Sequence, residues 1–222
     1  MRKFITFTLL IIFSGYLFCQ TNSNPNPTRF QSEIDNFIDW DAKNSFPENA
    51  ILFTGSSSIR MWKTHDGFPE KVLINRGFGG AHISDMLHYF DQIVGKYRPS
   101  LIVFYCGDND VDFGKSAEQT FADFKLFFEQ VEKLGSKTDL IYLPAKPSPA
   151  RWAKYPEMKK LNILVNSLAG QKDNLKYVDI TEPMLLPNEK PDPSVYLSDS
   201  LHLNKQGYDR WEKILHPLLE KY

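Results

Sequence analysis

Two short segments of the sequence carry side chains that could together perform nucleophilic catalysis. Ser56, Ser57 and Ser58 directly follow an apolar run, and Asp199 and His202 precede a C-terminal stretch of helical period. A serine hydroxyl attacks poorly at neutral pH unless a base takes its proton, and an imidazole serves best as that base when a carboxylate fixes its tautomer. Ser57, His202 and Asp199 match these three needs and are the candidate catalytic residues.

Two further segments could stabilise the oxyanion of a tetrahedral intermediate. Gly80 lies in a glycine-rich stretch after the second apolar run, and Asn109 follows the third. Oxyanions are typically bound by backbone N–H groups and a side-chain amide. The N–H groups of Ser57 and Gly80 and the amide of Asn109 could supply three such donors. Each motif alone also has a plain structural explanation, since serines commonly cap helices and loop histidines commonly pack or face solvent.

Taken together and in this order, the four segments resemble the conserved blocks of the SGNH, or GDSL, hydrolase family. The resemblance spans residues 51–222 and implies a flavodoxin-like sheet, a metal-independent esterase or lipase activity, and the roles given above to the serine, glycine, asparagine and histidine. The matching segments are residues 55–59, Gly80, residues 107–110 and the pattern Asp199-x-x-His202-x-Asn204.

One position departs from the family pattern. The family usually has Asp before the nucleophile, whereas this chain has Ser56. Alignment from Gly55 points to Ser57 as the nucleophile, and Ser56 and Ser58 remain open as alternatives. The Gly-x-Ser-x-Gly elbow of the α/β-hydrolases is absent from the sequence, so that architecture is not expected.

Apolar runs of strand length alternate with stretches of helical period along the chain. Continuous hydrophobicity in the runs suggests strands that are buried on both faces. Strands that alternate with helices predict a parallel sheet with helices on both sides, which is a three-layer α/β/α sandwich with a five-stranded sheet. The predicted strands are 51–54, 72–75, 101–106, 139–143 and 175–180, and helical faces are predicted within 30–38, 83–97, 121–134, 158–168 and 208–218.

The N-terminus predicts export. Arg2 and Lys3 precede an apolar run over 4–18, which is too short to span a membrane and is typical of a signal peptide. Cleavage after Cys19 would leave a flexible leader, 20–28, and one hydrolase domain, 29–222. Lipid attachment at Cys19 is the weaker alternative, because bulky Phe18 precedes it. We therefore expect a periplasmic or extracellular protein without an integral membrane segment.

Composition excludes several other classes of protein. Removing Arg2 and Lys3 from the 26 basic and 27 acidic residues leaves a net charge of −3, which is not a nucleic-acid footprint. Residues 107–119 lack the Gly and Glu of an EF-hand calcium loop, and residues 75–82 lack the third glycine of a dinucleotide fingerprint. We expect no metal and no cofactor, and a buried packing role for Cys106.

The proline-rich segment 144–152 should lie at the rim of the site, outside helix and central strand. Its Arg151 and Trp152 could contact substrate by binding an anionic group or stacking on a sugar, or could serve only to pack the loop. His82 is the only other histidine expected near the site.

These observations predict a secreted serine esterase that cleaves short-chain acyl esters, with an acylated carbohydrate as the preferred substrate class. The alternatives are a catalytically silent glycan-binding module of the same fold, or a lysophospholipase, thioesterase or transferase with the same triad. The partner in either case is a small-molecule or glycan ester. The sequence does not determine the natural ester, the acyl length or the oligomeric state.

Overall fold

The computed structural model describes residues 24–135 and 138–222. The expected signal peptide, 1–19, and residues 20–23 of the expected leader lie outside these ranges. Regular structure begins before the expected domain start at residue 29, because a 3-10 helix, η1, covers Pro27–Phe30. The Asn26 side chain caps this helix by accepting a hydrogen bond of 3.0 Å from the Thr28 N–H. Within the described ranges, no helix has the length and apolarity to cross a membrane.

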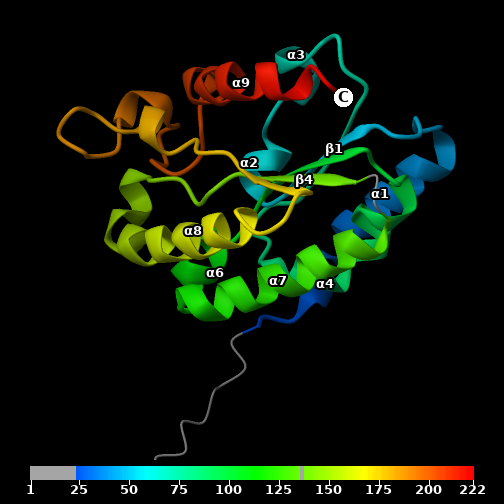
Figure 1. Cartoon of the computed structure of the whole chain (residues 1–222), viewed down its shortest axis with the longest axis horizontal. Coiled ribbons are helices and arrows are strands. Elements are labelled where there is room, and N and C mark those ends of the chain that lie inside the picture. Colours follow the sequence, from blue (N-terminus) through cyan, green and yellow to red (C-terminus); the bar gives the residue numbers. More distant parts are fainter. Residues whose placement is uncertain (1–23, 136–137) are drawn as a thin grey trace, which may run out of the picture.

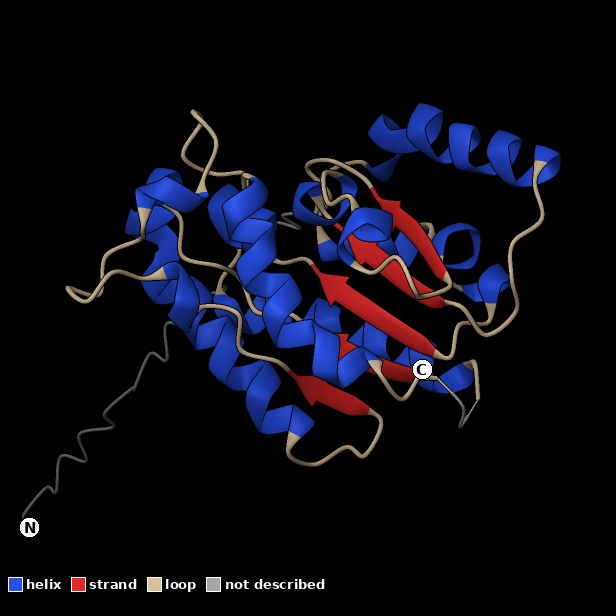
Figure 2. Ribbon diagram, turned by 90° about the horizontal axis from the view of Figure 1, so that it is seen from above, coloured by secondary structure: helices blue, strands red, loops and turns tan. Residues whose placement is uncertain are grey.

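Five parallel strands form one sheet, as the sequence predicts, and their order is β2-β1-β3-β4-β5. Figure 2 shows the sheet and the helices around it. Their register aligns Ile51 with Leu73 on one side and with Leu101 on the other. Because all strands run the same way, their carboxyl ends share one edge of the sheet. The strands are β1 (Ile51–Gly55), β2 (Leu73–Gly77), β3 (Leu101–Tyr105), β4 (Asp139–Tyr142) and β5 (Leu175–Tyr177).

Helices connect the strands, and one predicted helix is broken. Residues 83–97 form α4, α5 and η2 instead of one helix, because Tyr89 and Val94 leave helical backbone geometry. The helices after η1 are α1 (Gln31–Lys43), α2 (Ser57–Arg60), α3 (Thr64–Gly67), α4 (Ile83–His88), α5 (Phe90–Ile93), η2 (Gly95–Tyr97), α6 (Asp108–Phe113), α7 (Ala117–Lys133), η3 (Pro149–Lys154), α8 (Tyr155–Ala169), η4 (Glu182–Met184), η5 (Pro193–Val195) and α9 (Lys205–Leu219).

Alternation along the strands divides the core into two clusters, one on each face of the sheet. Leu52 and Ile102 pack with residues of α1, α4, α7 and α8. Phe53 and Val103 point the other way and pack with residues of α2 and α9, including the fully buried Trp211. Figure 1 shows α9 on one side of the sheet and α4, α7 and α8 on the other. The three-layer α/β/α fold follows from this period of two, which turns successive side chains to opposite faces.

The ends of β1 and β3 approach each other closely where the strand order reverses. Gly55 has a φ of 140°, and a Cβ built on it would lie 2.0 Å from the Tyr105 carbonyl oxygen. The same oxygen accepts a hydrogen bond of 2.9 Å from the Ser56 N–H. Glycine is required here because no side chain fits between the strands and because the backbone angle is unfavourable for other residues.

We expect Gly55→Ala to be strongly destabilising. Gly114 offers a matched control, since its φ is 113° but nothing lies within 4 Å of a Cβ built on it. Gly114→Ala should lower the free energy of unfolding only by the backbone strain, which is about 1–3 kcal/mol. Gly55→Ala should lower the free energy of unfolding by at least about 2 kcal/mol more, because the clash is added. Urea denaturation of both variants measures the difference, and equal losses would contradict this account of Gly55.

Candidate active site

The candidate residues gather at the carboxyl edge of the sheet. Ser57 is the first residue of α2, directly after β1, and Asn109 lies in α6, after β3. The strand order reverses between these two strands, and ligands of open α/β sheets bind at such a point. Gly80 follows β2, and the loop with Asp199 and His202 follows β5 and precedes α9.

Ser57, His202 and Asp199 form a continuous chain of hydrogen-bonded side chains. The Ser57 Oγ lies 2.9 Å from His202 Nε2, and His202 Nδ1 lies 2.7 Å from Asp199 Oδ2. If Asp199 accepts the Nδ1–H, the unprotonated Nε2 faces the serine hydroxyl. This tautomer is the one that a general base needs.

The structure distinguishes the three serines of the turn. Ser56 and Ser58 are 0% and 1% exposed, whereas Ser57 is partly exposed. The Ser58 Oγ accepts a hydrogen bond of 3.1 Å from Lys146 Nζ, and the Ser56 Oγ has no partner among the described residues. Only the Ser57 hydroxyl is therefore both accessible and in contact with His202.

The Asp199–His202 segment is a closed loop with its own internal bonds. Tyr196 pairs with Leu203 at its base, and the Leu197 N–H donates to the His202 carbonyl at 2.7 Å. Asp199 Oδ1 accepts hydrogen bonds of 2.9 Å from the backbone N–H groups of Leu201 and His202. Partial burial raises the pKa of Asp199, but these bonds and the His202 side chain outweigh it and lower the pKa to about 2. The carboxylate is thus charged at neutral pH.

Asn204, which belongs to the same sequence motif, has a structural role. Its side chain accepts a hydrogen bond of 3.1 Å from the Gly207 N–H and caps α9. The Asn204 amide also donates to the carbonyls of Ser194 and Tyr196, at 2.7 and 3.1 Å. The residue therefore joins the histidine loop to the start of the last helix.

The expected oxyanion donors come from the turns after β1, β2 and β3. Gly80 is exposed, has a φ of 78°, and would have no atom within 4 Å of a Cβ. Asn109 Nδ2 donates one hydrogen bond of 2.9 Å to the Ala81 carbonyl, which ties the β3 turn to the β2 turn. An amide nitrogen carries two hydrogens, so the second N–H of Asn109 is free for a ligand. The Ser57 N–H begins α2 and has no acceptor within that helix.

Buried charges hold the Gly80 loop in place. The Ile83 N–H donates to Asp110 Oδ2 at 3.1 Å, and Lys115 Nζ donates to Asp110 Oδ1 at 2.9 Å. Burial raises the pKa of Asp110 to about 6 against the effect of Lys115. His82 Nδ1 lies 3.7 Å from Asp110, and burial together with the charge of Lys115 lowers the pKa of His82 to about 4. His82 is therefore neutral at pH 7, and it packs beside the buried Asp110 that holds the Gly80 loop.

Lys146 is a second buried cation beside the site, after Lys115, and it was not identified from the sequence. The expectation that residues 144–152 lie at the rim is wrong for residues 144–148, which are buried. Lys146 is 2% exposed, and its Nζ lies 3.1 Å from Ser58 Oγ, 3.1 Å from Tyr105 Oη and 3.7 Å from Asp108 Oδ2. It links the turns after β1, β3 and β4. A lysine directly after an apolar run was the available signal.

Asp108 is the anionic partner of this network. The Tyr105 hydroxyl donates to Asp108 Oδ2 at 3.1 Å, and Arg151 Nη1 lies 3.1 Å from the same oxygen. Burial would raise the pKa of Asp108, but the charges of Lys146 and Arg151 outweigh it and lower the pKa. The Cys106 thiol nearby is buried, as expected, and burial raises its pKa.

Arg151 and Trp152 lie in the 3-10 helix η3, which corrects the expectation of a wholly irregular loop. Pro149 is tolerated there because it occupies the first turn, where its missing N–H is not needed. Arg151 is held by Asp108 and by Asp112, whose Oδ2 lies 3.2 Å from Arg151 Nε. Trp152 stacks on Tyr155 at a centroid distance of 5.2 Å and packs against the core. Two carboxylates thus balance the guanidinium, which leaves it poorly suited to binding an anion.

No group of three or more histidine, cysteine, aspartate or glutamate side chains in the described ranges could hold a metal ion.

Replacing Lys146 by Met should destabilise the fold, because Asp108 would keep a buried charge with one cation fewer. Breaking a buried pair costs about 3–5 kcal/mol, and we expect the lower end because Arg151 remains. Lys160→Met is the control, since Lys160 forms an exposed pair with Glu157 that should contribute less than about 1 kcal/mol. Urea denaturation measures both, and a Lys146→Met protein as stable as the Lys160→Met protein would contradict the network.

Solved structures with the same fold come from several bacteria. A Streptococcus pneumonia protein has a TM-score of 0.76 and 21% identity, with 86% of this chain and 93% of that chain covered. A GDSL-like lipase from Bacteroides thetaiotaomicron has a TM-score of 0.72 and 24% identity, with 88% and 98% covered. An acetyl-xylooligosaccharide esterase variant from Geobacillus Stearmophilus has a TM-score of 0.62 and 13% identity, with 79% and 97% covered. No curated protein gives a significant match.

A protein-family model described as the GDSL-like Lipase/Acylhydrolase family matches residues 59–210. The match includes Gly80, Asn109, Asp199 and His202 and begins just after Ser57, so the choice of serine depends on the contacts described above. It covers more than half of the sequence. The chain belongs to the GDSL-like Lipase/Acylhydrolase family.

Proposed function

We propose that the protein is an exported serine esterase that hydrolyses short-chain carboxylic esters of carbohydrates through an acyl-enzyme. One observation carries this proposal: the accessible Ser57 hydroxyl lies 2.9 Å from an imidazole whose other nitrogen lies 2.7 Å from a carboxylate. Among the functions open to this fold, ester hydrolysis by an activated serine uses all three groups.

In the acylation step, the Ser57 Oγ attacks the ester carbonyl carbon while its proton passes to His202 Nε2. The carbonyl oxygen becomes an oxyanion, which the N–H groups of Ser57 and Gly80 and the free N–H of Asn109 bind. Asp199 stabilises the imidazolium through Nδ1. The intermediate collapses when the bond to the alcohol oxygen breaks, and His202 gives its proton to that oxygen. The product alcohol leaves and Ser57 carries the acyl group.

Deacylation repeats these roles with water. His202 Nε2 takes a proton from a water molecule, whose oxygen attacks the acyl carbon, and the same donors bind the second oxyanion. Collapse releases the carboxylic acid and returns the proton to Ser57 Oγ. No further chemical group is required at any step.

Several features support a neutral, acylated carbohydrate as substrate. Arg151 is already paired with Asp108 and Asp112, which disfavours an anionic ligand. The sequence has no long apolar segment of the kind that covers lipase sites. A relative of the same fold acts on acetylated xylooligosaccharides. The N-terminal signal pattern would place the protein among extracellular or envelope polymers.

Serine replacements on short-chain p-nitrophenyl esters test the mechanism. Ser57→Ala should lower kcat by at least about 10³-fold, because the attacking oxygen is lost. Ser56→Ala is the matched control from the same turn, since its hydroxyl is buried and does not contact His202. It should retain most of the activity. Unchanged turnover in Ser57→Ala would overturn the assignment, and loss of turnover in Ser56→Ala alone would move the nucleophile by one residue.

Replacement of Asp199 by Asn tests the part that this carboxylate plays. The pKa of this carboxyl is about 2, so it is charged throughout the range of an esterase assay. Asp199→Asn should lower kcat by about 10²–10⁴-fold, because the base loses the group that sets its tautomer. Steady-state kinetics on p-nitrophenyl acetate at pH 7 measure this loss. A kcat within about tenfold of the wild-type value would show that Asp199 does not act on His202.

A further inference from the structure

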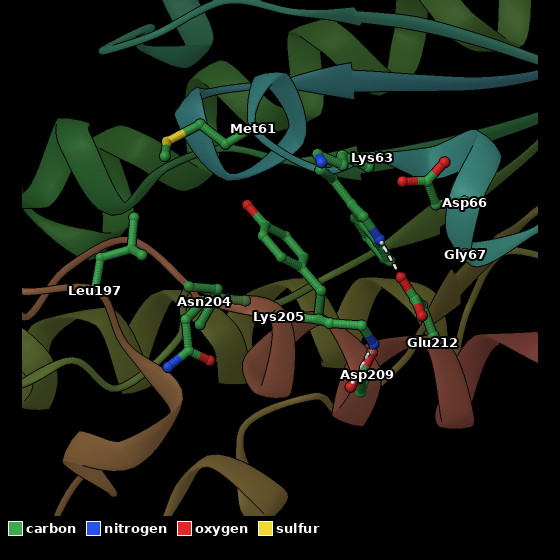
Figure 3. A pocket seen from close by; sticks show the side chains of 12 residues that line it. Met61, Lys63, Asp66, Gly67, Leu197, Asn204, Lys205, Asp209 and Glu212 are labelled. Carbon is green, nitrogen blue, oxygen red and sulfur yellow. Dashed lines mark hydrogen bonds and ion pairs between the residues drawn. The ribbon is translucent and has the colours of Figure 1, made fainter.

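We propose that the pocket between α2, α3 and α9 is the leaving-group subsite, and that it binds the carbohydrate alcohol of the ester. This inference rests on the proposed function and assigns one side of the same site. The pocket has a volume of about 380 Å³, which lies within the range of small-ligand sites. Figure 3 shows Met61 and Leu197 at one end and Asp66 and Glu212 at the other.

Two exposed apolar residues connect the pocket to the catalytic residues. Met61 lies one turn after Ser57, and its N–H donates to the Ser57 carbonyl at 2.9 Å. Leu197 pairs with His202 through the backbone at 2.7 Å. Their exposed fractions are 38% and 40%, so both side chains are open to a ligand. The apolar end of the pocket is therefore formed by two residues whose backbones are hydrogen-bonded to those of Ser57 and His202.

The chemistry of the reaction decides which half of the ester points this way. His202 gives a proton to the leaving oxygen, so the alcohol must leave on the side of His202. Leu203 and Asn204, which follow His202 in the chain, line the pocket. Gly80 and Asn109, the oxyanion donors, belong to the turns after β2 and β3 and do not line it. The pocket is thus placed for the alcohol rather than for the carbonyl oxygen.

The lining fits a neutral ligand with many hydroxyl groups. The ring systems of Trp62 and Tyr208 stand beside the carboxylates of Asp66, Asp209 and Glu212. Carboxylates accept hydrogen bonds from sugar hydroxyls, and sugar C–H faces pack on aromatic and apolar side chains. Lys205 lies 2.7 Å from Asp209, so this cation is locally balanced. With Lys63 as the other cation, acidic groups outnumber basic ones, which disfavours an anionic alcohol.

Contacts with the catalytic turn hold the pocket in shape. The Tyr208 hydroxyl donates to the Ser58 carbonyl at 2.9 Å. Trp62 Nε1–H donates to Glu212 Oε1 at 2.9 Å. Gly67 leaves room for this carboxylate, because a Cβ there would lie 2.3 Å from the same oxygen. The pocket is largely preformed, as small-molecule sites usually are.

Two esters of the same acid separate the subsite from the triad. The probes are two acetate esters. Acetylated xylobiose releases a sugar as its leaving group, and p-nitrophenyl acetate releases p-nitrophenol. The quantity to compare is kcat/KM for acetylated xylobiose divided by kcat/KM for p-nitrophenyl acetate. Glu212→Gln and Asp66→Asn remove the charge of an acceptor and should lower this ratio about tenfold or more. Met61→Trp, which narrows the apolar end, should lower it without removing an acceptor.

Glu220→Gln is the matched control. Glu220 is exposed just beyond α9 and does not line the pocket, so its replacement should leave the ratio unchanged. Circular dichroism and thermal melts establish that each variant is folded. A ratio that stays at the wild-type value in all three pocket variants overturns the subsite. Wild-type turnover of p-nitrophenyl acetate alone also overturns it and leaves the esterase proposal standing. Absence of turnover on both esters overturns the proposed function itself.

Discussion

The contact between the ends of β1 and β3 determines the geometry of the whole site. Gly55 lets the β1 backbone approach Tyr105, and the Ser56 N–H bonds to the Tyr105 carbonyl. This contact sets the direction in which the chain enters α2 and therefore the position of Ser57. The same strand end leads into Asp108 and Asn109. One backbone contact thus sets the position of Ser57 relative to the turn that carries Asn109.

Buried polar groups secure this arrangement on both sides of the turn. Lys146 and Asp108 lie on one side and link three strand ends, while Asp110 and Lys115 lie on the other and hold the loop after β2. Buried ion pairs contribute little net stability, but they are costly to break. Here they join turns that no regular hydrogen-bond ladder connects. Rigid loops of this kind favour electrostatic preorganisation.

The sequence was sufficient for the layers and for the histidine and the aspartate of the candidate triad. Strand burial on both faces and helical periodicity are local patterns, and both are repeated many times along this chain. The break at Tyr89 was not predictable, because the apolar period continues through it. Nor was the burial of Lys146, since its partners Ser58 and Tyr105 are 88 and 41 residues away. Choosing among three adjacent serines likewise required the position of an imidazole that is far away in sequence.

The bond between Ser57 and His202 joins residues 145 positions apart, whereas Asp199 and His202 belong to one small loop. Asp199 and His202 are therefore brought together by a local turn of the chain, whereas their contact with Ser57 depends on the tertiary fold. Synthesis proceeds from the N-terminus, so Ser57 is made long before Asp199 and His202. The hydrogen-bonded chain of these three side chains can therefore form only after residues 199–202 have been made and have packed against the turn after β1.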